Sequence, residues 1–286
     1  MPPAAWEFTA IGTRWQIVTA AALDGAVRAE VEHLIDGFDR AWSRFRDDSL
    51  VSELARAGGV RTAPPDTAAM LDVYVALSAA TGGAVNPLVG AALARRGYDA
   101  GYSLIDRGAT AAPAGWTEIV HWSAHDLELQ APATIDVGAL GKGRLVDRVA
   151  ALLAERGERS VVVDASGDIS VRGTTERIAL EHPFDARRAI GVWEVSDAAL
   201  CASATNRRAW GDGLHHVLDA RTGEPVRTIA ATWAVAADAM TADAVTTALF
   251  FDGGPAYAAA RDAQWVRMTT DGKVEWSPGC EAELFS

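Results

Sequence analysis

The residues best suited to chemistry gather in a glycine-rich stretch near the middle of the chain, Asp136-Val137-Gly138-Ala139-Leu140-Gly141-Lys142-Gly143. Three glycines within six residues let backbone N–H groups approach a ligand closely, and a helix that starts here adds partial positive charge. Lys142 adds a full charge. The pattern suits a phosphate-bearing anion, although it matches neither the phosphate loop nor the dinucleotide fingerprint. The alternative is a strand-turn-helix corner with a solvated lysine.

A second candidate lies in the segment from Thr241 to Leu249. Asp243 and Thr247 are four residues apart, so on a helix their oxygens share one face. A carboxylate beside a hydroxyl suits a hard cation such as Mg2+, which often takes the remaining ligands from water and phosphate. The alternative is that Thr241 or Asp243 merely caps the helix.

The third candidate is the pair His215-His216 with Asp219 close behind. Adjacent residues on a strand point to opposite faces, which argues against joint metal ligation by the two histidines. One histidine near Asp219 could orient a substrate or move a proton. Two other polar clusters, residues 203–208 and the turn at Asp168, could equally be solvated loops.

Hydrophobic periodicity predicts the elements that must position these residues. Helices are expected at 26–42, after a cap at Ser49, at 66–80, and at 242–250 entered through Thr241. A strand at 134–137 should lead into the central helix, which carries Leu145, Val149 and Leu152 and ends near Gly157. Further strands are expected at 6–20 with a bend at Gly12-Thr13, 117–121, 126–130, 160–164, 169–172, 176–181, 189–195, 215–219, 231–235, and in a hairpin around Asp271-Gly272. Helices and strands mix without strict alternation, which favours an α+β fold.

Composition narrows the class of protein. The 286 residues are 49% hydrophobic and 22% charged, typical of a globular protein with one large domain or two small ones. With 26 basic and 38 acidic residues the net charge is −12, which argues against nucleic acid or anionic membrane as a general partner. Cys201 and Cys280 have no metal-type spacing. We expect no signal peptide, no membrane span and a cytoplasmic location.

Taken together and in order, these pieces resemble the FAD:protein FMN transferase (ApbE) family. The resemblance covers roughly residues 8 to 255. It rests on Gly12-Thr13, Ser43-Arg44-Phe45-Arg46 with Ser49, Gly83-Ala84-Val85-Asn86-Pro87, the glycine-rich stretch with Asp147, Ser166-Gly167-Asp168-Ile169, Ala202-Ser203-Ala204, His215 to Asp219, Arg221-Thr222-Gly223, and Asp243 to Thr247.

The resemblance implies an α+β fold of mixed, largely antiparallel sheets with packed helices, ApbE-like and related to the T-fold. It implies a single catalytic domain over residues 1–286, with two lobes as the alternative arrangement. The implied activity is Mg2+-dependent: the enzyme binds FAD, attaches FMN through a phosphoester to a threonine or serine of a target protein, and releases AMP.

The resemblance also implies residue roles. Asp243 and Thr247 would hold the cation, together with a backbone carbonyl at the turn near Gly141. His215 or His216 would activate the incoming hydroxyl or position phosphate, and Asp219 joins them as a catalytic residue. The residues expected to contact the flavin nucleotide are Ser43, Phe45, Asn86, Gly138, Lys142, Asp168, Ser203, Arg207 and Thr222.

The chain departs from the family pattern at five positions. Phe45 stands where tyrosine is frequent, Ala55 where asparagine is, Asn86 for aspartate, Gly141 for alanine and Ala204 for glycine. The first three could change how the flavin or adenine is held. Family members also handle FAD in more than one way, including hydrolysis, so one alternative is a Mg2+-dependent FAD pyrophosphatase that yields FMN and AMP. A second is a protein that holds FAD without turnover, which Ala55 and Asn86 motivate, and a third is a scaffold without a ligand.

Overall fold

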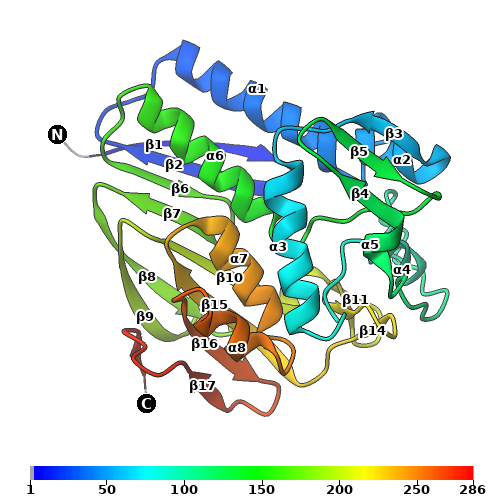
Figure 1. Ribbon diagram of the computed structural model, residues 1–286. Helices are drawn as coiled ribbons and strands as arrows, with labels where there is room; N and C mark the ends of the chain where they lie inside the picture. Colours follow the sequence, from blue (N-terminus) through cyan, green and yellow to red (C-terminus); the bar gives the residue numbers. More distant parts are fainter. Residues whose placement is uncertain (1–2, 286) are drawn as a thin grey trace.

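The computed structural model describes residues 3–285, and its largest sheet has eight strands, each antiparallel to its neighbours (Figure 1). The order across the sheet is β1 (Ala4–Ala10), β2 (Thr13–Thr19), β6 (Val161–Asp164), β7 (Asp168–Arg172), β10 (Ala199–Ala204), β15 (Ile229–Ala236), β16 (Gln264–Thr269) and β17 (Val274–Trp276). Strands from both ends of the chain therefore meet in one sheet. Strands β16 and β17, from the C-terminal part of the chain, lie at the edge opposite β1.

Each face of this sheet packs against a different layer. Helices α1 (Gly25–Trp42), α6 (Gly141–Glu155) and α7 (Ala239–Ala248) cover one face (Figure 1). A three-stranded sheet of β8 (Thr175–Glu181), β9 (Ala189–Ser196) and β18 (Glu283–Leu284) packs on the other. The alternation of side chains along a strand separates the two cores: in β10, Cys201 joins the helix side and Leu200 the β8–β9 side.

Smaller elements surround this framework. Helices α3 (Thr67–Ala80) and α8 (Gly254–Ala259) pack on α7. A third sheet contains β3 (Gly59–Thr62), β5 (Asp126–Leu129) and β4 (Val120–Trp122), with α2 (Leu50–Ala57) and α5 (Trp116–Ile119) next to it. The remaining elements are α4 (Gly90–Arg95), the 3-10 helix η1 (Thr205–Arg208), and the strand pairs β11 (Ala209–Trp210) with β12 (Leu214–His215) and β13 (Leu218–Asp219) with β14 (Glu224–Pro225).

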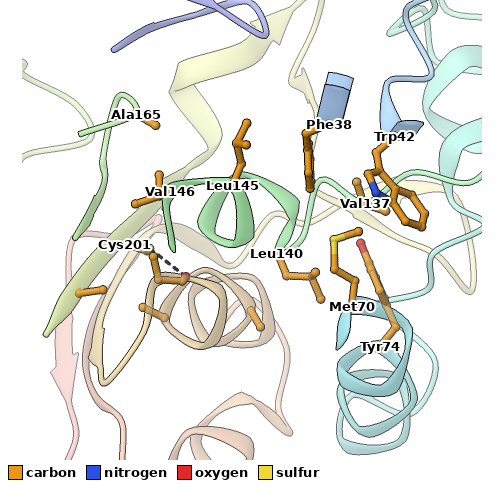
Figure 2. Close-up of a cluster of buried hydrophobic side chains, with 14 of the residues drawn as sticks. Phe38, Trp42, Met70, Tyr74, Val137, Leu140, Leu145, Val146, Ala165 and Cys201 are labelled. Atoms are coloured by element: carbon orange, nitrogen blue, oxygen red, sulfur yellow. Dashed lines mark hydrogen bonds between the residues drawn. The ribbon is translucent and has the colours of Figure 1, made fainter. Parts of the chain in front are cut away.

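The central helix α6 is buried along its first half. Figure 2 shows Leu140, Leu145 and Val146 at this helix, with Phe38 and Trp42 of α1 and Met70 and Tyr74 of α3 packed around its start. Leu140, Leu145 and Val146 are fully buried. Burial of apolar surface, worth about 25 cal/mol per Å2, therefore fixes the position of the glycine turn that precedes α6.

Several local predictions are confirmed. Ser49 caps α2, accepting a hydrogen bond from the N–H of Ser52 at 3.1 Å. Gly157 follows α6 with φ 90°, the left-handed conformation that favours glycine after a helix. Gly272, with φ 89°, lies in the turn that joins β16 to β17. None of the helices within residues 3–285 is both long and apolar enough to cross a membrane.

Other local predictions are wrong. Residues 134–137 form no strand: they have no regular secondary structure, and the N–H of Asp136 donates to the Pro87 carbonyl at 2.7 Å. Residues 117–119 belong to α5, and 215–219 divide between β12 and β13. Helix α7 begins at Ala239 because Asp238, rather than Thr241 or Asp243, is its cap.

Candidate active site

One cavity of about 730 Å3 collects most of the predicted site residues. Its lining includes the predicted catalytic residue His216 and the predicted metal residues Gly141, Asp243 and Thr247. It also includes eight of the nine residues expected to contact the flavin nucleotide: Ser43, Phe45, Asn86, Gly138, Lys142, Asp168, Ser203 and Arg207. We distinguish two parts of this lining. The acidic wall comprises Lys142, Asp168, Asp243 and Thr247, and the aromatic wall comprises Phe45, Tyr98 and Tyr102.

The acidic wall is built where the first turns of α6 and α7 meet. The N–H of Gly143 donates to Asp243 Oδ2 at 3.0 Å, and the Thr247 hydroxyl donates to the carbonyl of Ala139 at 3.2 Å. Asp243 is only 4% exposed. The predicted spacing of Asp243 and Thr247 on one helix is therefore present, and it faces the turn before α6.

Lys142 is paired rather than solvated. Its Nζ lies 2.5 Å from Asp168 Oδ2 and donates to the Ala165 carbonyl at 3.1 Å. Although burial favours the neutral amine, the charges of Asp168 and Asp243 raise the pKa of Lys142. Burial and the nearby charge of Asp168 raise the pKa of Asp243 well above its ordinary value, with Lys142 opposing the shift.

The oxygens of this wall fit a hard divalent cation. Asp243 contributes a carboxylate, Thr247 a hydroxyl and Ala139 a carbonyl, the donor types that Mg2+ binds. Both oxygens of Asp168 are buried and accept no well-aligned hydrogen bond within residues 3–285, although Lys142 is in ionic contact with one of them. When both are ionised, two buried carboxylates sharing one lysine leave excess negative charge, which a cation would neutralise.

The described residues contain no cluster of three or more His, Cys, Asp or Glu side chains suited to a metal. A cation held by one carboxylate, one hydroxyl and one carbonyl would need other ligands to complete its shell. Water and substrate phosphate are the usual sources for Mg2+. The donor set therefore fits a metal that is shared with a phosphate-bearing ligand.

The two histidines have opposite surroundings. His216 lines the cavity, and its Nδ1 has no hydrogen-bond partner among the described residues. Burial, with the charge of Arg208, lowers the pKa of His216 to about 3, so the ring is neutral at physiological pH. His215 instead lies with Nε2 2.8 Å from the Val226 carbonyl, and its Nδ1 accepts from the N–H of Val217.

The aromatic wall is formed by loops. The ring of Phe45 is stacked on that of Tyr102, with centroids 5.2 Å apart and planes at 7°, and meets Tyr98 edge-on. Arg44 lies beneath this group, 4.2 Å from the Phe45 ring centroid. Its guanidinium is fixed by Asp136 at 2.5 Å and by the Tyr98 carbonyl at 2.7 Å, which ties the loop after α1 to the glycine turn.

Other predicted contacts line the cavity but already have partners. The Asn86 amide donates to the Pro113 carbonyl and its oxygen accepts from the N–H of Leu88, so this side chain organises its own turn. The Ser203 hydroxyl is 3.0 Å from that of Thr246. Both side chains are held by these hydrogen bonds, and their predicted contact with the flavin nucleotide stays a prediction.

His215, Asp219 and Thr222 are not part of the cavity wall that the described residues form. The Asp219 carboxylate holds the guanidinium of Arg221 at 2.6 Å. The Thr222 hydroxyl accepts from the N–H of Glu224 at 3.1 Å. Asp219 and Thr222 thus shape the turn between β13 and β14, and their predicted roles stay predictions.

Sequence reasoning missed three contributors to the site. Tyr98 and Tyr102 complete the aromatic wall, and Arg208 bonds to the Tyr98 hydroxyl. One tyrosine on each side of Gly101, in a stretch without periodicity, was the available signal. A backbone carbonyl at the turn near Gly141 was expected, and the carbonyl that faces Thr247 there is that of Ala139.

Comparison with known proteins places this geometry in context. A protein from Klebsiella pneumoniae named FAD:protein FMN transferase is 24% identical over 269 residues, which cover 85% of this chain and 77% of that protein. A protein of the same name from Treponema pallidum is 29% identical over 264 residues, covering 80% and 72%.

The solved structure of the flavin transferase ApbE from Vibrio cholerae superposes with a TM-score of 0.80 over 96% of this chain and 97% of that one, at 22% identity. This likeness confirms the predicted fold class, mixed helices and antiparallel sheets in an ApbE-like arrangement. The ApbE family model matches residues 11–267, nearly the whole chain. The chain therefore belongs to the ApbE family.

Proposed function

We propose that the protein is an FAD:protein FMN transferase that uses Mg2+, attaches FMN through a phosphoester to a threonine or serine of a target protein, and releases AMP. Relatives across most of the chain carry the transferase name. One observation supports the proposal most directly: a single cavity combines oxygen donors suited to Mg2+ with an aromatic surface suited to a flavin. Its volume lies within the range of cofactor pockets.

The two walls suit different parts of FAD. A planar ring system gains from stacking on aromatic side chains, so the isoalloxazine is assigned to Phe45 and its neighbours. The pyrophosphate is assigned to the acidic wall, beside Lys142. Asp243, Thr247 and the Ala139 carbonyl would hold Mg2+ there, and the bound ion would neutralise charge on the pyrophosphate as it reacts.

We assign His216 as the group that accepts the proton of the incoming hydroxyl. Its ring is neutral, and its Nδ1 has no hydrogen-bond partner within residues 3–285, so an incoming hydroxyl can direct its hydrogen toward this nitrogen. The hydroxyl oxygen would form a bond to the phosphorus of the FMN half while the bond from that phosphorus to the AMP oxygen breaks. The negative charge of the bound pyrophosphate would raise the pKa of His216, so that the hydroxyl proton passes to this ring while AMP leaves with the electron pair of the broken bond.

Lys142 supplies fixed positive charge beside the reacting phosphates. Because its ammonium is already held by Asp168, it is oriented before the substrate arrives and loses little freedom on binding. The net charge of −12 makes such local placement necessary, since the overall field of the protein repels an anionic substrate.

The test is to incubate the protein with FAD and Mg2+, with and without a threonine-bearing flavin-acceptor domain. AMP, free FMN and covalent flavin fluorescence on a gel are then followed. We expect AMP together with labelled acceptor. AMP with free FMN in both samples would identify a pyrophosphatase, and bound FAD without AMP would identify a binding protein. Either result would overturn the proposal.

A further inference from the structure

Two carboxylates join the first turns of α6 and α7, one supplied by each helix. Asp147 on α6 accepts from the N–H of Ala239 at 2.8 Å and from that of Met240 at 2.9 Å. In return, Asp243 on α7 accepts from the N–H of Gly143 at 3.0 Å. Asp147 lies four residues after Gly143 on α6, and Asp243 lies four residues after Ala239 on α7. On each helix, the carboxylate and the amide that contact the other helix therefore lie on the same face.

The helices can make this exchange because they approach closely. A Cβ at position 143 would lie 2.2 Å from the carbonyl oxygen of Ala239 and 2.8 Å from the Cβ of Asp243, so only glycine fits. From the other side, the Cys201 thiol of β10 donates to the same Ala239 carbonyl at 3.3 Å, the dashed line in Figure 2. The first turn of α7 is thus held by α6 and by the sheet.

The amides at the start of α7 have few other acceptors. A helix leaves its first N–H groups without partners inside the helix. The Asp238 side chain accepts from the N–H of Thr241, whereas those of Ala239 and Met240 both donate to Asp147. Ala239 is fully buried. Loss of the Asp147 carboxylate would leave a buried amide without an acceptor and would release the first turn.

The donors assigned to the metal follow directly along α7. Asp243 lies one turn after Ala239 and Thr247 one turn further, so a displacement of the first turn moves both relative to the Ala139 carbonyl on the α6 side. Asp147 is absent from the cavity lining formed by residues 3–285 and would act only through α7.

We infer that Asp147 is a positioning residue for the metal donors, because its carboxylate fixes the start of α7 to α6 and so sets Asp243 and Thr247 against the carbonyl of Ala139. This inference rests on the metal site of the proposed function. It adds a residue that touches neither the substrate nor the ion.

The experiment measures binding of Mn2+, in place of Mg2+, to the intact protein by the EPR signal of the free ion. In Asp147→Asn, which keeps the shape of the side chain but has one acceptor oxygen, the dissociation constant should rise at least about tenfold. The Mg2+ concentration for half-maximal AMP release should rise in parallel. The rate at saturating Mg2+ should fall far less, because the donors themselves are intact.

Asp66→Asn is the matched control. Asp66 holds Arg144 and Arg148 of the same helix α6, at 2.9 and 2.6 Å, on contacts that do not involve α7. This variant should lower the melting temperature and leave Mn2+ affinity unchanged. Asp147→Ser, which keeps a small polar side chain but no carboxylate, is measured alongside in case the asparagine variant does not fold, and should also weaken Mn2+ binding.

The outcomes separate the two proposals. Wild-type Mn2+ affinity in a folded Asp147 variant with a lowered melting temperature would overturn the inference, as would equal loss of affinity in Asp66→Asn. Weakened Mn2+ binding in a protein that transfers no FMN would uphold the inference while the proposed function fails. A wild-type protein that binds no Mn2+ would overturn both.

Discussion

The acidic wall and the aromatic wall of the cavity rest on different kinds of structure. Asp243, Thr247 and Lys142 project from helices whose first turns are fixed to each other, and Asp168 begins a central strand of the sheet. Phe45, Tyr98 and Tyr102 lie on loops, and Tyr102 is 51% exposed. The side chains of the acidic wall need more precise placement than the aromatic rings, because the energy of charge neutralisation depends strongly on distance, whereas stacking tolerates small shifts.

The largest effect should follow from Asp243→Ala. Loss of this carboxylate removes a predicted metal donor and the acceptor for the N–H of Gly143. We expect Mg2+-dependent AMP release to fall by about 10³-fold. Flavin binding at the aromatic wall, measured by quenching of FAD fluorescence, should persist. Full activity in this variant would remove the distinction between the two walls, because the acidic wall would then be dispensable.

The histidine pair offers the next test, with its own control. His216→Gln should lower the rate of transfer by about 10²-fold, the contribution typical of a proton-transferring side chain. His215→Gln should lower stability through the lost contact with the Val226 carbonyl and leave the rate at saturating substrate nearly unchanged. Both variants are compared by AMP release and thermal melting, and a reversed order of the two rates would contradict the assignment.

At the aromatic wall, Phe45→Ala should weaken FAD binding by about tenfold, because one stacked ring contributes roughly 1 kcal/mol beyond its buried area. The rate at saturating FAD should change little. Phe184→Ala removes a ring that is 59% exposed and outside the cavity lining, so it serves as the matched control in the same titration. A large loss of rate at saturating FAD would show that this wall does more than hold the ring.

The smallest effect concerns stability. The pKa of His216 is lowered to about 3 in the folded protein against 6.5 in the unfolded chain, so below pH 6.5 the unfolded chain binds more protons. Stability is therefore lost as the pH falls, by about 1 kcal/mol between pH 6.5 and 5.5 from this group. Burial raises the pKa of Asp147 to about 6, which acts in the opposite direction between pH 6 and 3.8.

Urea unfolding of the wild type and His216→Gln at both pH values isolates the histidine, because the Asp147 contribution is common to the two proteins. The variant should lose less stability on acidification. Identical pH dependence would mean that His216 is not buried as neutral imidazole, which would also weaken its assignment as the proton acceptor.

Helices with one apolar face could be predicted from the sequence. Helix α1 follows from Val31, Ile35, Phe38 and Trp42 at helical spacing, and these four are its buried residues. Strand β10 could not be predicted in the same way. Its sequence, from Ala199 to Ala204, contains no β-branched residue, and it forms a strand because it pairs with β7 and β15 on its two sides.

In the site, too, local features could be predicted from the sequence and distant contacts could not. The four-residue spacing of Asp243 and Thr247 is local, and it predicted a shared face correctly. The partners of those side chains are not local: Gly143 is 100 residues from Asp243, and Ala139 is 108 from Thr247. Hydrophobic periodicity carries no information about contacts between residues so far apart in the sequence. Before the structure, only the resemblance to a family placed these segments in one site.

Because Gly143 and Asp243 are 100 residues apart, the two parts of the proposed metal site are synthesised at different times. When the chain has been synthesised up to residue 238, the glycine turn, Lys142 and both histidines are present, but helix α7, which carries the predicted metal donors Asp243 and Thr247, is not. On the proposed function, transfer of FMN should therefore begin only after the final sixth of the chain has emerged.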